Sequence, residues 1–348
     1  MPIHFGSIIQ EHTQVRQQGG LFDVSHMARI NLKGVGARKF LERLLTRRVS
    51  DMKPNTCRYT LICNHQGGVL DDVLIYKYPE HWMLVVNASN REKILKHIAA
   101  VQEETAYPVA IDDVTQETAM VAIQGPKVMQ MISNFSSEIV ALKRYTFCEK
   151  QLLNLHMTIS RTGYTGEDGV EVILNASMAE KAIEMMLHSA GKEGQAIKPS
   201  GLGARDSLRL EAAMPLYGHE LAEDIDPLTV GLGFAVSLDK DQDPDAISFI
   251  GQEQLKKIKS QGLTRKLVGI KLQGKRTARQ GMDVSFEGNN VGQITSACIS
   301  PTLGYPIAMA ILNIQATNLG AVVEIKKNQR VIASGQIVSL PFYKKPAK

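Results

Sequence analysis

The sequence has few of the marks that assign a chain to a class of proteins at first sight. It contains no apolar run long enough to span a membrane, so we expect no integral membrane protein and no membrane partner. Its cysteines form no CxxC pair, which predicts neither a disulfide framework nor a zinc site and suits a reducing compartment. The cysteines are Cys57, Cys63, Cys148 and Cys298.

Motifs for nucleotides, metals and nucleic acids are missing as well. The glycine patterns at 34–39, 201–206 and 231–234 lack the third glycine of a dinucleotide fingerprint, and none clearly follows a strand within a βαβ unit. The chain has no GxxxxGK[ST] loop and no HExxH pair, so we expect no metal. No arginine-rich or aromatic-interleaved basic run indicates a nucleic-acid partner.

The composition is that of a globular protein of moderate size. Its 348 residues predict about two domains, with three possible. Hydrophobic residues make up 44% and charged residues 22%, which is typical of an ordered chain with a core. The net charge of +5 is compatible with an acidic partner or an anionic ligand, and equally with a solvated basic surface.

Strand and helix patterns mix without a regular βαβ rhythm, which favours an α+β fold. Apolar runs predict strands over 57–63 and 69–78 around a glycine turn, and a helix is expected over 125–142. Another helix should open at Pro199 and end near Pro215, because proline disrupts a helix interior. After about residue 262 short apolar strands alternate with Gly, Asn and Ser turns, which predicts a separate β-rich terminal domain.

The stretch GGVLDDVLIY at 67–76 carries the clearest candidate chemistry. Two glycines mark a sharp turn, and the apolar run after the two aspartates predicts a strand. Because side chains alternate between the faces of a strand, Asp71 and Asp72 are expected to point in opposite directions. One carboxylate could then face a cavity as an acid, a base or an electrostatic stabiliser. The alternative is a turn with two solvated aspartates.

Further motifs follow one another in a characteristic order along the whole chain. They are LFDVSHM (21–27), GGVLDD (67–72), NASN (87–90), IQGP (123–126), RTGYTGEDGVEV (161–172), GLGARDSLRLEA (201–212), LYGHEL (216–221), FIGQEQL (249–255), ITSACISPTL (294–303) and PFY (341–343). In this order they closely resemble the aminomethyltransferases, the T-proteins of the glycine cleavage system.

The resemblance implies an α+β fold with two interlocked folate-binding domains and a C-terminal β-barrel-like domain. We expect the bilobal region to cover residues 1–260 and the barrel to cover 261–348. Family members usually carry a further segment, with a strand, ahead of the position of Met1, so we expect a neighbouring strand here to lack that partner. A bacterial-type chain of this family is expected in the cytoplasm, and a eukaryotic one in the mitochondrial matrix.

T-proteins transfer a one-carbon unit from an aminomethyl group, carried on the dihydrolipoyl arm of H-protein, to tetrahydrofolate, and ammonia is released. The resemblance therefore implies tetrahydrofolate as co-substrate and lipoylated H-protein as partner. The organic reactivity lies largely in the folate nitrogens and the lipoyl sulfur, which leaves positioning and electrostatics to the protein. The alternative is a non-catalytic folate-binding or assembly protein that has kept the same scaffold.

The family's catalytic aspartate corresponds to Asp72, which would stabilise a developing cationic carbon and orient, or accept a proton from, the folate nitrogen. Asp71 then has a structural role. The family's substrate glutamate corresponds to Glu171, whose carboxylate can accept the two adjacent N–H donors of a pterin. Glu167 and Asp168 are the alternatives, and both are expected in a turn.

Other folate-binding candidates come from the remaining motifs. Arg205 matches the family's arginine and would present its planar fork to folate oxygens. Tyr164 is expected either to pack against the ring or to serve ordinary hairpin packing. Tyr343, Asn87 and Arg279 match the family's folate-binding positions more loosely. His26 is either a cavity residue or a structural histidine.

Overall fold

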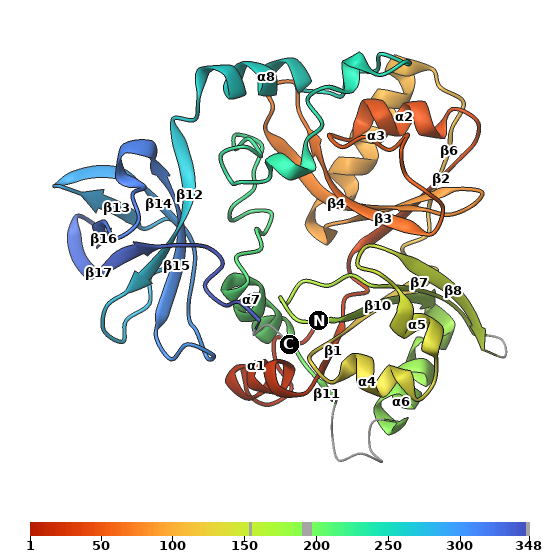
Figure 1. The fold of residues 1–348 in the computed structure, drawn as a ribbon, viewed down its shortest axis with the longest axis horizontal. Coiled ribbons are helices and arrows are strands. Elements are labelled where there is room, and N and C mark those ends of the chain that lie inside the picture. Colours follow the sequence, from red (N-terminus) through yellow and green to blue (C-terminus); the bar gives the residue numbers. More distant parts are fainter. Residues whose placement is uncertain (153–154, 190–196, 346–348) are drawn as a thin grey trace.

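The computed structural model describes residues 1–152, 155–189 and 197–345. Within these residues the chain forms two open β-sheets and one closed barrel, and helices cover the outer faces of the two sheets (Figure 1). The barrel lies on the opposite side of helix α7 from the sheet with the yellow and green strands. This mixed architecture confirms the α+β fold with a terminal barrel that the sequence predicted.

One sheet has six strands in the order β11-β1-β7-β10-β9-β8 and is antiparallel except where β1 meets β11. Its strands are β1 (Gly20–Asp23), β7 (Thr118–Gln124), β8 (Phe147–Leu152), β9 (Leu155–Ser160), β10 (Gly169–Asn175) and β11 (Lys198–Pro199). Strand β10 lies in the middle and is buried over 169–174. A central strand with both faces covered reads as a nearly continuous apolar run, which describes most of this segment.

The other sheet has five strands in the order β3-β4-β5-β2-β6. Its strands are β2 (Ala28–Lys33), β3 (Thr56–Cys63), β4 (Val69–Lys77), β5 (Trp82–Val86) and β6 (Ala110–Asp113). Strands β3 and β4 form the hairpin predicted around the glycine turn, and Gly67 there has a φ of +82°. A side chain at that φ is strained, which explains the glycine.

The chain passes between the two sheets twice, which interlocks them. It leaves the six-stranded sheet after β1, builds the five-stranded sheet from β2 to β6, and returns with β7. Arg29 fastens the two crossings, because its guanidinium donates to the carbonyls of Ser25 (3.0 Å) and Thr115 (2.6 Å). This side chain is fully buried, and burial lowers the pKa of Arg29 to about 10, so the cation persists at neutral pH.

The terminal barrel closes in the order β12-β15-β14-β13-β16-β17. Its strands are β12 (Arg265–Leu272), β13 (Asp283–Phe286), β14 (Asn289–Ile299), β15 (Pro306–Asn313), β16 (Val322–Lys327) and β17 (Arg330–Val338). Closure leaves no sheet edge unpaired, which removes the hazard of edge-to-edge association. The β-rich texture after residue 262 therefore predicted this part of the fold correctly.

Eight α-helices occur in the described part of the chain. They are α1 (Ile8–Gln17), α2 (Ala37–Leu44), α3 (Arg91–Thr105), α4 (Val128–Ser133), α5 (Ser137–Ala141), α6 (Ala179–Ser189), α7 (Leu202–Glu211) and α8 (Gln252–Gln261). The single helix expected over 125–142 is wrong, because the segment breaks into α4 and α5. Ser136 starts the second of these by accepting a hydrogen bond from the Ile139 amide at its side chain, as helix-capping serines do.

Short 3₁₀ helices complete the connections between these elements. They are η1 (Ala88–Asn90), η2 (Ala176–Met178), η4 (Gly233–Ala235), η5 (Lys240–Gln242) and η6 (Ile314–Ala316).

Helix α7 lies where the three β-structures meet (Figure 1). It opens after Pro199 as predicted and ends at Glu211, shortly before Ala213 takes a left-handed φ of +54°. Near its start the Gly203 amide donates to the carbonyl of Ile3, and at its end the Glu211 carbonyl accepts from the Tyr343 amide. Both ends of the described chain therefore pack against this one helix.

Candidate active site

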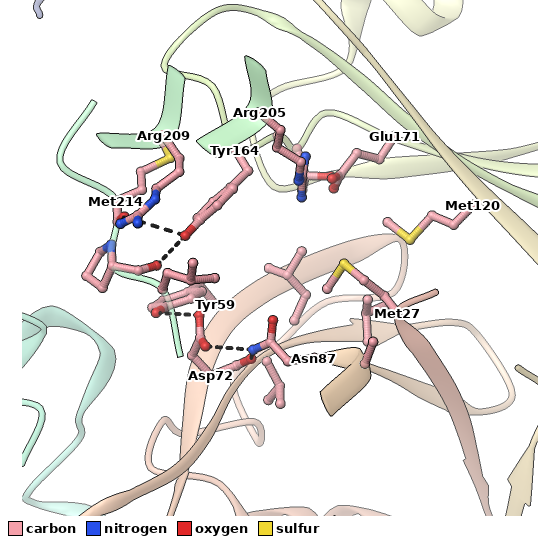
Figure 2. Close-up of a pocket in the computed structure, with 18 of the residues that line it drawn as sticks. Met27, Tyr59, Asp72, Asn87, Met120, Tyr164, Glu171, Arg205, Arg209 and Met214 are labelled. Atoms are coloured by element: carbon pink, nitrogen blue, oxygen red, sulfur yellow. Dashed lines mark hydrogen bonds between the residues drawn. The ribbon is translucent and has the colours of Figure 1, made fainter. Parts of the chain in front are cut away.

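A cavity of about 490 Å³ opens between the two sheets, α7 and the segment that follows it. All of the residues that line it lie between His26 and Phe234 in the sequence, so the barrel contributes none of them. Figure 2 shows the acidic and amide side chains of the five-stranded sheet at one end and Glu171 with Arg205 at the other. Its volume is that of a pocket for a drug-sized ligand.

Asp71 and Asp72 are the third and fourth residues of strand β4 and point to opposite faces, as the strand periodicity predicted. Asp72 lines the cavity, whereas Asp71 is fully buried behind it. Asp71 accepts hydrogen bonds from the Asn87 amide (3.0 Å), the Asn87 side chain (2.8 Å) and the Asn90 side chain (2.6 Å). These three donors satisfy a buried carboxylate and give Asp71 a structural role.

Asp72 receives two donors of its own. The Tyr59 hydroxyl donates to Oδ2 at 3.1 Å, and the Asn87 side chain donates to Oδ1 at 2.8 Å (Figure 2). Burial raises the pKa of Asp72, while these hydrogen bonds act in the opposite direction. Burial, and then the neighbouring Asp72 charge, raise the pKa of Asp71. The pair therefore ionises at higher pH than ordinary aspartates, which brings Asp72 towards the range of a useful general base.

Tyr59 is a cavity residue that the sequence reasoning missed. Burial, and then the Asp72 charge, raise the pKa of Tyr59 well above its ordinary value, so its hydroxyl remains a donor at neutral pH. The signal was present in the hairpin: Leu61 pairs with Asp72, and Tyr59 is the diagonal neighbour two residues earlier on the same face. The ring also stacks on Phe234, another cavity residue, at 6.1 Å between centroids.

Glu171 lies on β10 of the six-stranded sheet and faces the same cavity. It is 4% exposed and accepts a hydrogen bond from the Thr162 hydroxyl. Arg205, on α7, points its guanidinium towards this carboxylate in Figure 2. The buried Nη1 atom of Arg205 has no hydrogen-bond partner among the residues that the structure describes. Buried donors are nearly always paired in proteins, so this nitrogen is available to donate to a ligand oxygen.

Tyr164 lines the cavity between Arg205 and the segment after α7. The Arg205 guanidinium carbon lies 5.0 Å from the centre of its ring, within the range of a cation–π contact. Its hydroxyl donates to the Pro215 carbonyl, and burial raises the pKa of Tyr164, which keeps the proton on this donor. Tyr164 therefore supports the pocket wall and lines the cavity beside Arg205.

Two of the expected binding residues lie elsewhere. Tyr343 packs its ring 4.0 Å from the guanidinium carbon of Arg16, a cation–π contact that keeps it at α1 and out of the cavity lining. Arg279 is exposed on the barrel, and its amide donates to the sulfur of Met282. The loose matches of these two residues therefore do not bring them to the cavity.

The alternatives to Glu171 are engaged in ion pairs. Glu167 pairs with Arg16 (3.0 Å) and Asp168 with Arg161 (2.7 Å), and neither lines the cavity. His26 does line it, and partial burial followed by the Arg205 charge lowers the pKa of His26.

Further cavity residues were not singled out by the sequence reasoning. They include Met27, Met120, Leu202, Arg209, Met214 and His219. No group of three His, Cys, Asp or Glu side chains within the described ranges could hold a metal ion. A helix of the length and hydropathy needed to cross a bilayer is likewise not found among the described residues.

The structure is that of a two-lobed α+β protein with a terminal barrel and a cavity between the lobes. Two family models match this arrangement: the GCVT N-terminal domain over residues 1–240, and the glycine cleavage T-protein C-terminal barrel domain over residues 265–344.

Relatives and a solved structure agree with the family models. The aminomethyltransferase of Caldanaerobacter subterraneus is 42% identical over all of this chain and 91% of that protein. The aminomethyltransferase of Bacillus subtilis is 39% identical over 99% of this chain and 93% of that protein. The crystal structure of the glycine cleavage system aminomethyltransferase T from Bartonella henselae matches with a TM-score of 0.88 at 29% identity, covering 99% of this chain and 92% of that one.

The chain belongs to the glycine cleavage T-protein family. The expectation of an enzyme of the aminomethyltransferase class is thereby confirmed, and the non-catalytic alternative is not favoured.

Proposed function

We propose that the cavity binds tetrahydrofolate and that the enzyme moves a one-carbon unit onto it from the aminomethyl-dihydrolipoyl arm of H-protein, releasing ammonia. The observation that carries the proposal is the placement of Asp72 and Glu171. These carboxylates come from different sheets and face one cavity of about 490 Å³. Asp72 can stabilise the reacting carbon while Glu171 holds the folate that accepts it.

The residues at the Glu171 end fit a reduced pterin. An ionised carboxylate can accept the amino group and the adjacent ring N–H of the pterin together. The unpaired Nη1 of Arg205 would donate to a ligand oxygen, which removes the cost of leaving it buried without a partner. Tyr164 lines the same end of the cavity, with this guanidinium over its ring.

The residues at the Asp72 end fit a site where positive charge develops. We assign Asp72 to stabilising the cationic carbon and to orienting, or accepting a proton from, the attacking folate nitrogen. The side chains of Tyr59 and Asn87 hold its carboxylate in place, so little reorganisation is needed when the charge appears. Asn87 is assigned to this orienting role, since its side-chain nitrogen donates to the carboxylates of both Asp71 and Asp72.

The proposal extends to the partner, the location and the domain boundary. Lipoylated H-protein is the proposed donor, and the bacterial cytoplasm, or the mitochondrial matrix of a eukaryote, is the proposed location. The four cysteines are free, and three are buried, as suits a reducing compartment. We also propose a bilobal region of residues 1–260 and a barrel domain of 261–348, because the first described barrel strand begins at Arg265.

Ammonia release from aminomethylated H-protein, measured with and without tetrahydrofolate, tests this function. We expect tetrahydrofolate to accelerate release strongly and to appear as the methylene adduct. Folate binding without any acceleration of release would contradict the proposal and favour a non-catalytic folate-binding protein.

A further inference from the structure

The segment Met214–Leu216 forms one wall of the cavity without any regular secondary structure of its own. Side chains from other parts of the chain fix it. The Met214 carbonyl accepts from Arg209 Nη1 at 3.3 Å, and the Leu216 amide donates to Glu220 Oε2 at 3.0 Å. The Tyr164 hydroxyl donates to the carbonyl of the intervening Pro215. The shape of this wall therefore depends on Arg209 and Glu220.

Arg209 connects this wall to its surroundings. It is 1% exposed, and its Nη1 donates to Glu220 Oε2 at 2.9 Å while its Nε donates to Asp206 at 2.8 Å. Glu220 is fully buried, so the two charges compensate each other out of water. The planar guanidinium donates hydrogen bonds in several fixed directions at the same time. A lysine ammonium cannot reproduce that geometry.

The remaining nitrogen of Arg209 reaches the barrel. Its Nη2 donates to the hydroxyl of Ser296 on β14 at 2.8 Å. The register of β14 against β15 shifts between Ile294 and Ser296, and such bulges change the direction in which a side chain points. A second contact lies alongside, where His219 Nδ1 is 3.0 Å from the Thr295 carbonyl. Strand β14 thus contacts Arg209 before the Met214–Leu216 segment and His219 after it.

We propose that Arg209 is a positioning residue through which the barrel holds the cavity wall in its binding shape; the inference rests on the proposed binding of folate. The barrel supplies no cavity residue, so its effect on the ligand must pass through contacts of this kind. If Ser296 no longer fixes Arg209, the wall spends less time in the competent arrangement. The apparent dissociation constant rises in inverse proportion to that fraction, while a saturated enzyme turns over almost normally.

Two substitutions test the link, each with a matched control. Ser296→Ala removes the barrel's acceptor, and its control is Ser285→Ala, a buried serine of β13 that bonds Lys326 (3.0 Å). Arg209→Lys keeps the charge but loses the fork. Its control is Arg161→Lys, an arginine that similarly bonds two carbonyls and the carboxylate of Asp168.

Calorimetric affinity for tetrahydrofolate and ligand-free hydrogen exchange of the Leu216 amide are the readouts. Ser296→Ala loses a hydrogen bond from a charged guanidinium, together with the contact of the Ser296 hydroxyl with His219 Nδ1 at 3.2 Å, and should raise the dissociation constant about tenfold. Arg209→Lys loses several charged hydrogen bonds and should raise it at least as much. Turnover of Ser296→Ala at saturation should stay within about twofold, because Ser296 does not line the cavity. The Leu216 amide should exchange faster than in wild type in both variants, and its exchange rate should be unchanged in both controls.

The exchange measurement separates this inference from the proposed function. If the wild-type protein binds no tetrahydrofolate, the proposed function fails, and exchange at Leu216 alone decides whether the barrel holds the wall. Unchanged exchange in Ser296→Ala and Arg209→Lys overturns the inference. Faster exchange with an unchanged affinity overturns it too, because the wall would then have no bearing on binding.

Discussion

Asp72 and Glu171 face one cavity from two different β-sheets. Asp72 lies on β4 of the five-stranded sheet, and Glu171 lies on β10 of the six-stranded sheet. Their separation is therefore set by how the sheets pack. Arg29 fastens the two chain crossings between the sheets, and a hydrophobic cluster with residues from both sheets joins them. The site exists only in the folded arrangement of both lobes.

Asp72→Asn should reduce one-carbon transfer by about 10²–10³, because the amide keeps the shape but removes a preorganised charge. The affinity for tetrahydrofolate should change only by a modest factor. Asp71→Asn should transfer the one-carbon unit at a rate closer to that of wild type. It should unfold at a lower temperature, because its new side-chain N–H donors would face three existing donors. Turnover and thermal unfolding of both variants check this. Near-normal turnover of Asp72→Asn, or the reverse order of the two, would show that the catalytic carboxylate is misassigned.

Glu171→Gln should weaken folate binding more than it slows the bound-state chemistry. Glutamine accepts at one oxygen but turns a donor towards the second pterin donor. Hydrogen bonds to charged groups contribute about 1.5–3 kcal/mol, so the dissociation constant should rise about tenfold or more. Isothermal calorimetry measures it directly, with Glu167→Gln as the control, because Glu167 pairs with Arg16 outside the cavity. An unchanged affinity of Glu171→Gln refutes the assignment.

Glu211 should make the fold sensitive to acid. Burial alone would raise the pKa of Glu211, but hydrogen bonding and the charges of His12 and Arg16, with Ser300, lower it to about 2. Because the folded-state pKa lies below the ordinary 4.5, the stabilisation is complete above about pH 4.5 and is lost as the pH falls towards about 2.

Urea unfolding from about pH 5.5 to about pH 2.5 measures this loss. Wild type should lose about 2–3 kcal/mol more than Glu211→Gln over that range. The exposed Glu253 of α8 offers the control, and Glu253→Gln should follow wild type. If the free energy of unfolding falls equally with pH in wild type and Glu211→Gln, Glu211 is not a cause of the acid sensitivity.

The apparent Michaelis constant for H-protein should climb with ionic strength while that for folate barely moves. The net charge of +5 favours an acidic partner, and salt screens exposed charges beyond about 8–10 Å. Lys257 and Lys259 are exposed on α8. Replacing both by Glu should raise the apparent Michaelis constant for H-protein. The same change at the exposed Lys275 and Arg276 of the barrel should raise that constant less. If salt affects both substrates equally, or neither, charge-guided docking is refuted.

Local periodicity was enough to predict several parts of the site. The β3–β4 hairpin and the opposite directions of Asp71 and Asp72 follow from strand alternation alone. The same register could have identified Tyr59 as a neighbour of Asp72. The end of α7 before Pro215 follows from proline chemistry.

Contacts between distant parts of the chain could not be predicted in this way. Arg209 and Ser296 are 87 positions apart and meet only because the barrel packs on α7. Tyr343 follows its Pro–Phe pair as expected, yet the Arg16 cation holds its ring away from the cavity. The break between α4 and α5 depended on whether Ser136 caps a new helix, and the apolar spacing did not reveal it.

A single turnover with carbon-13 in the aminomethyl group of H-protein tests the central claim most directly. In wild type we expect the label to appear in 5,10-methylenetetrahydrofolate with one ammonia released per carbon transferred. In Asp72→Asn we expect folate to bind while the label moves about 10²-fold or more slowly. Label that never reaches folate in wild type, or that reaches it equally fast without the Asp72 charge, would contradict the account.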